Sequence, residues 1–88
     1  MKRSRDFRLQ LVGGRDLLVP LGAKVLEMNA LVVLNPTGRC VWELLADDRS
    51  PDEIAAAVAG RFAVDPERAR ADVRAFLDEL GRMGLLEK

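Results

Sequence analysis

The chain has 88 residues, of which 49% are hydrophobic, and its 14 basic and 14 acidic side chains give a formal net charge of zero. This length predicts a single domain, residues 1–88, and this composition is typical of a soluble globular protein. The balanced charge argues against a dedicated nucleic-acid binder, and no apolar run approaches the roughly 20 residues of a membrane helix.

Residues 6–34 carry the pattern of a small antiparallel sheet. Residues 7–11 alternate apolar and polar side chains, which predicts a half-buried strand. Gly13 and Gly14 follow as a hairpin pair, because glycine tolerates positive φ. Residues 16–20 then predict a second strand that ends at its proline or lies at a sheet edge.

The third strand is predicted at an unbroken apolar run, Leu31 to Leu34. Residues 23–28 before it indicate extended chain, and Asn29 and Ala30 form a turn-like pair. A continuous apolar run is expected of a strand that is covered on both faces. In so short a chain, the run raises the question of what covers its second face.

Three helices are predicted over residues 36–86, because each has a start signal. Asn35 can cap a helix that has proline at its first position. Residues 50–53 spell a capping box, and residues 65–67 place acidic groups at the start of the longest helix. Gly84 is suited to end that helix in a left-handed conformation.

The element order predicts an α+β fold, with a three-stranded antiparallel sheet followed by three helices in a winged helix-turn-helix-like arrangement. A DNA-binding winged-helix regulator and a structural dimerisation domain are two functions that this arrangement could serve. The would-be recognition helix, residues 67–82, has four acidic and four basic residues, so it offers phosphates no net attraction. A homodimer could cover the apolar strand with a second copy.

The residue types argue against an enzyme. Histidine is absent, and Cys40 is the only cysteine, which excludes an internal disulfide and fits a reducing cytosol. A Ser–His or Cys–His pair is therefore impossible, and a zinc site is improbable. We expect a cytoplasmic protein with no catalytic residue, no metal and no cofactor.

Two groups of residues have alternative interpretations. The basic segment of residues 2–8 indicates a solvated tail or a patch for an acidic partner. Cys40 and the large apolar side chains Trp42, Phe62, Phe76 and Leu77 are expected in the core rather than at a contact surface.

The pattern from Leu17 to Leu86 resembles the PqqD family of peptide chaperones, also called recognition elements for ribosomally made, post-translationally modified peptides. The resemblance rests on an ordered set of short motifs: LNP at 34–36, WELL at 42–45, DEI at 52–54, Phe62, VD at 64–65, FL at 76–77 and GLL at 84–86. One departure is the longer segment LGAKVLEMNA at 21–30.

The resemblance implies a non-catalytic adaptor that binds the leader segment of a precursor peptide. The leader is added as a strand beside the third strand, packed against the third helix, and is presented to a modifying enzyme, often a radical S-adenosylmethionine enzyme. Pyrroloquinoline quinone is one candidate product of such a pathway.

The walls of the peptide groove are expected on the third strand and the third helix: Leu31, Val32, Val33, Leu34, Arg70, Val73, Arg74 and Leu77. On this interpretation the free edge of the apolar run takes the incoming strand by β-augmentation. The arginines could meet acidic residues of a leader, or they could belong to a solvated helix face stabilised by ion pairs. The alternative for the apolar run is a strand covered by the protein's own helices.

Overall fold

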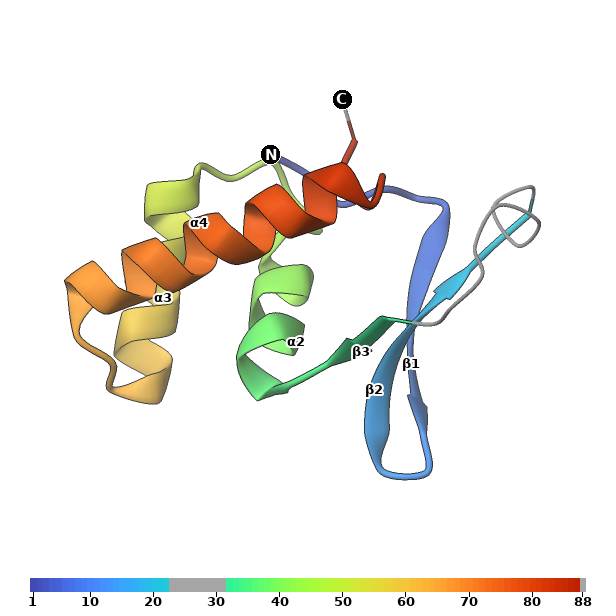
Figure 1. Ribbon diagram of the computed structural model, residues 1–88, viewed down its shortest axis with the longest axis horizontal. Coiled ribbons are helices and arrows are strands. Elements are labelled where there is room, and N and C mark those ends of the chain that lie inside the picture. The colour runs from blue at the N-terminus through green and yellow to red at the C-terminus, as the bar shows by residue number, and fades with distance from the viewer. Residues whose placement is uncertain (23–31, 88) are drawn as a thin grey trace.

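The structure, a computed structural model, describes residues 1–22 and 32–87 (Figure 1). Its elements in chain order are the strands β1 (Phe7–Val12), β2 (Arg15–Pro20) and β3 (Val32–Leu34) and the helices α2 (Pro36–Leu44), α3 (Pro51–Phe62) and α4 (Pro66–Arg82). The predicted α+β fold is confirmed. The predictions for residues 23–30 and for Leu31 lie outside the described residues.

The three strands form one antiparallel sheet in the order β1-β2-β3. The hairpin between β1 and β2 turns at Gly13 and Gly14, whose φ angles are 58° and 80°. Positive φ at both central positions defines the tight hairpin turn that the glycine pair predicts. The sheet projects from the helical part as a two-stranded hairpin flanked by the short β3 (Figure 1).

Each helix begins where its capping signal predicts. The Asn35 side chain accepts a hydrogen bond of 2.7 Å from the backbone N–H of Gly38. Ser50 and Glu53 form a reciprocal capping box, and the Asp65 carboxylate accepts from the N–H of Arg68. Gly84, with φ of +74°, follows the end of α4 as predicted. Because each capping signal acts within one helical turn, it can be predicted from the sequence alone.

One core joins the inner face of the sheet to the inner faces of the helices. Its described members are Phe7, Leu18, Leu34, Cys40, Val41, Trp42, Leu45, Ile54, Ala55, Val58, Ala69, Val73, Leu77, Leu80 and Leu85. Cys40, Trp42 and Leu77 are therefore core residues, as expected. Phe62 and Phe76 are half-buried and pack against this core at its margin.

The basic N-terminal segment is not a solvated tail. The backbone N–H of Arg3 donates to the carbonyl of Leu45 over 2.9 Å, and Ser4 donates to the carbonyl of Leu85 over 2.9 Å. The Arg3 guanidinium donates to the Trp42 carbonyl at 3.1 Å and lies 5.7 Å from the indole centroid. The segment therefore ties the end of α2 to the chain beyond α4. No helix of the described residues is long and apolar enough to cross a membrane.

Candidate functional site

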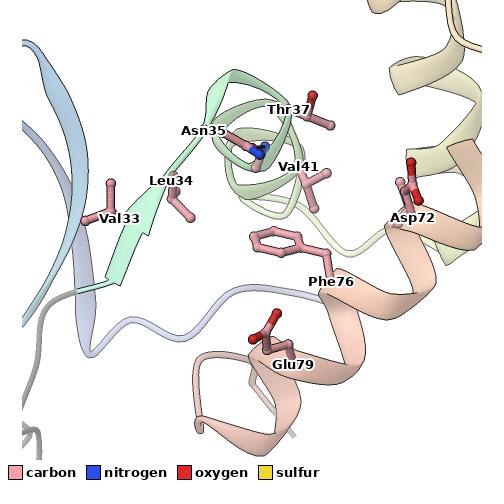
Figure 2. A pocket seen from close by; sticks show the side chains of 10 residues that line it. Val33, Leu34, Asn35, Thr37, Val41, Asp72, Phe76 and Glu79 are labelled. Atoms are coloured by element: carbon pink, nitrogen blue, oxygen red, sulfur yellow. Dashed lines mark hydrogen bonds between the residues drawn. The ribbon is translucent and has the colours of Figure 1, made fainter.

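A groove of about 560 Å³ lies between β3, the first half of α2 and the middle of α4 (Figure 2). Ten described residues line it: Val33, Leu34, Asn35, Thr37, Gly38, Val41, Asp72, Val73, Phe76 and Glu79. Because β3 is the last strand of the described sheet, one wall of the groove is a sheet edge. Such an edge offers backbone donors and acceptors to an added strand.

The hairpin geometry fixes which β3 residue presents its backbone to the free edge. Val12 and Arg15 flank the two-residue turn, so they form a hydrogen-bonded pair, and bonded pairs then recur at every second residue. The N–H of Leu21 donates to the carbonyl of Asp6 over 2.7 Å, which agrees with this alternation. In β2, the odd-numbered residues therefore bond to β1, and the even-numbered residues bond to β3.

It follows that Val32, opposite Leu18, and Leu34, opposite Asp16, direct their backbone groups toward β2. Val33, opposite Leu17, directs its N–H and C=O away from the sheet. Among the described residues of β3, only Val33 therefore has an N–H and a C=O that face away from the sheet and are free to bond to an added strand.

The side chains of β3 show what covers each face of the apolar run. Leu34 is 5% exposed and faces the core, whereas Val33 is 55% exposed on the opposite face, beside Leu17. The strand alternates between two faces, although its sequence does not alternate in polarity. An exposed valine beside a groove is consistent with a strand whose second face has room for a ligand.

Apolar side chains from α2 and α4 line the centre of the groove. Figure 2 shows the Phe76 ring lying between Val41 of α2 and Leu34 of β3. Gly38 makes this close approach possible, because a Cβ at that position would lie 3.3 Å from Phe76 Cζ and 3.1 Å from Asn35 Oδ1. Phe76 therefore packs over α2 while one side of its ring remains at the groove.

Arg39 holds the start of α2 against the sheet. Its guanidinium lies 3.2 Å from an Asp16 carboxylate oxygen on β2 and 2.7 Å from Glu43 one turn further along α2. The hydrogen bond to Glu43, followed by the charge of Asp16, raises the pKa of Arg39 above its ordinary value. This pair of contacts connects β2 to α2, and α2 is one of the elements around the groove.

The acidic residues Asp72 and Glu79 lie at the α4 side of the groove, on either side of Phe76 (Figure 2). Asp72 pairs with Arg68 on the same helix, at 3.6 Å. The ten lining residues include these two carboxylates and no lysine or arginine. Among the residues that the structure describes, no cluster of three or more potential ligands could hold a metal ion.

The structure brings together part of the predicted site. Val33, Leu34 and Val73 line the groove, and Val32 adjoins it on β3. Leu77 is 2% exposed and belongs to the core, while Leu31 lies outside the described residues.

Arg70 and Arg74 lie outside the groove lining. Their guanidinium nitrogens are 3.8 Å and 4.0 Å from the same oxygen of Asp52 on α3. A contact between either arginine and a leader remains a prediction, and in the structure both arginines lie near α3 in exposed pairs with Asp52.

Sequence reasoning missed seven lining residues: Asn35, Thr37, Gly38, Val41, Asp72, Phe76 and Glu79. A helical projection of α4 would have grouped positions 72, 76 and 79 on one flank of its apolar stripe. The α2 residues carry a weaker signal, because Asn35 and Gly38 are explained by helix capping alone.

Two comparisons with known proteins identify relatives of this fold and sequence. A chain described as "TbiB1 in Complex with the TbiA(beta) Leader Peptide" matches with a TM-score of 0.77 and 28% sequence identity, covering 99% of this chain and 95% of that chain. A search of curated proteins found no match. The model of the family described as coenzyme PQQ synthesis protein D (PqqD) matches residues 20–86, so the chain belongs to the PqqD family.

Proposed function

We propose that this protein is an adaptor that binds the leader segment of a ribosomally made precursor peptide as an added β-strand. The single observation that carries the proposal is the outward-facing backbone of Val33 beside a groove of about 560 Å³. The related TbiB1 chain, 28% identical, is described in complex with a leader peptide. Family membership over residues 20–86 supports the same role.

The bound strand would lie between β3 and α4, with Val33, Leu34 and Val73 from the predicted set in contact with it. Backbone hydrogen bonds to the sheet edge supply register, and side chains in the groove supply selectivity. Val32 and Leu77 lie outside the groove lining, and they hold β3 and α4 in place.

The protein acts without catalysis, by raising the concentration of its bound precursor at a modifying enzyme. A radical S-adenosylmethionine enzyme is the partner class that the family resemblance implies. The described groove contains two carboxylates, an amide and a hydroxyl, and the chain has no histidine to activate that hydroxyl. We assign the chemistry to the partner enzyme.

The direct test is calorimetric titration with the leader segment of the precursor peptide encoded beside this gene. We expect one peptide per chain and competition between leader and full precursor. Absence of heat at peptide concentrations of about 1 mM, which corresponds to binding weaker than about 4 kcal/mol, would contradict the proposal. Binding of duplex DNA with micromolar affinity at about 150 mM salt would favour the regulator instead.

A further inference from the structure

The charges of α4 are divided between two sides of the helix. Residues 67–82 contain four acidic and four basic side chains, so the helix is neutral as a whole. Arg70 and Arg74 lie within 4.0 Å of Asp52 on α3, whereas Asp72 and Glu79 line the groove. The side of α4 that faces the groove is therefore negative.

The two carboxylates bracket the apolar centre of the groove. Asp72 precedes Phe76 by about one helical turn, and Glu79 follows it by nearly one turn, so their Cα atoms are about 10 Å apart along the helix axis. Figure 2 shows the Phe76 ring between them, directed toward Leu34 and Val41. An occupant of the groove would meet an apolar surface with a negative group on each side.

Among the described residues, the lining supplies no positive charge to balance these carboxylates, because none of its ten members is lysine or arginine. Asp72 does have Arg68 at 3.6 Å, but both side chains of that pair are well exposed, at 64% and 77%. Exposed ion pairs are weak and are readily exchanged for another cation. Glu79 should therefore contribute at least as much as Asp72 to the recognition of a cationic ligand.

We infer that the groove selects peptide strands in which an apolar residue is flanked on both sides by lysine or arginine. This inference rests on the proposed function, and it specifies the class of leader. Residues two positions apart in a strand point to the same face and are separated by about 6.7 Å. Basic residues two positions before and after the apolar residue can thus approach the two carboxylates while it packs on Phe76.

The sign of this selectivity is opposite to that expected if Arg70 and Arg74 contacted the leader. Those arginines would attract acidic peptides, but their contacts with Asp52 direct them toward α3. Charge complementarity at the groove instead favours basic peptides.

The test is selection from a displayed library of random 12-residue peptides on the wild-type full-length protein. Counter-selection uses Val33→Pro, which removes the edge donor, and separately Phe76→Ala, which removes the apolar contact. Peptides that both variants fail to retain are groove ligands, and their sequences reveal the preferred charges. Circular dichroism of each variant identifies any that does not fold.

We expect the retained peptides to be enriched in Lys or Arg around an apolar residue. Asp72→Asn combined with Glu79→Gln should weaken these peptides roughly three- to tenfold, as for the loss of two partly exposed ion pairs. Asp78→Asn is the matched control, because Asp78 is exposed on the same helix and lies outside the lining. Asp72→Lys combined with Glu79→Lys should select acidic peptides.

Three results would overturn the inference in different ways. Groove ligands without basic enrichment, insensitive to the double neutral variant, would refute the charge selectivity and leave peptide binding intact. If every peptide retained by the wild type is also retained by the variants, or if none is retained at all, peptide binding in the groove is refuted. A dimer in solution that Val33→Pro converts to monomer would show that a second copy occupies the edge, and this also overturns the inference.

Discussion

Proline at Val33 separates the binding role of β3 from its structural role. Proline has no backbone N–H, and at this position the N–H points to the free edge rather than into the sheet. Edge strands tolerate proline where the lost donor is not part of the ladder. We therefore expect Val33→Pro to unfold within a few degrees of the wild type.

Proline at Val32 should have the opposite effect. The N–H of Val32 points toward Leu18 in β2, so proline removes a ladder hydrogen bond and leaves the Leu18 carbonyl without a partner. An unpaired buried backbone group costs about 1–3 kcal/mol. For a domain of this size, such a loss lowers the melting temperature by roughly 5–20 °C.

The binding assay completes the comparison. Loss of the edge donor in Val33→Pro should cost about 1 kcal/mol or more of leader affinity, which is roughly a fivefold or greater rise in Kd. Val33→Ala is the control, because it shortens the side chain and retains the N–H. Calorimetric titration gives the affinities, and thermal unfolding by circular dichroism gives the stabilities. A folded Val33→Pro protein that binds a leader as tightly as Val33→Ala would refute the assignment of this edge.

Three further substitutions test other parts of the structure. Arg3→Ala should lower the melting temperature by roughly 4–10 °C. It removes a hydrogen bond and a cation–π contact that are together worth about 1 kcal/mol or slightly more. Arg5→Ala is the control, because Arg5 is exposed and its loss should change the melting temperature little. The hydrogen bond from the Ser50 N–H lowers the pKa of Glu53 below its ordinary value. The contribution of this group to stability is therefore full above the ordinary pKa and is lost as the pH falls through the lowered one. Glu53→Gln keeps the capping bond, so unfolding measured from pH 6 to pH 3 should show a smaller loss of stability in the variant. Gly38→Ala should leave stability near that of the wild type, because alanine favours the helix by about 1 kcal/mol and crowding of Phe76 by the new Cβ offsets this gain. Displacement of the Phe76 ring into the groove should weaken leader binding severalfold in the same titration.

The parts of the fold that the sequence predicts are those encoded within a few residues. Asn35 and the Ser50 capping box satisfy helix donors within one turn, and the Gly13-Gly14 pair sets the hairpin. None of these signals depends on where another element packs. The N-terminal segment differs, because the role of Arg3 depends on contacts with Trp42 and with the chain beyond α4.

The groove was harder to predict because it depends on how elements face one another. A helical projection separates Asp72 and Phe76 from Arg70 and Arg74, on opposite flanks of the apolar stripe of α4. It does not determine which flank meets β3 and which meets α3. The observed packing places the arginines at α3, and this choice decides the sign of the charge at the groove.

The shortness of β3 implies that side chains carry most of the binding energy. Within the described strand, only Val33 offers a donor and an acceptor to an added strand, and each such hydrogen bond contributes about 0.5–1.5 kcal/mol. Micromolar binding requires about 8 kcal/mol, so the backbone supplies the smaller share. The larger share must come from apolar burial against the half-buried Phe76 and the exposed Val33 side chain, with the carboxylates adding selectivity. Phe76→Ala should therefore weaken leader binding more than Val33→Pro, and the reverse order would indicate that the sheet edge, rather than the groove, dominates recognition.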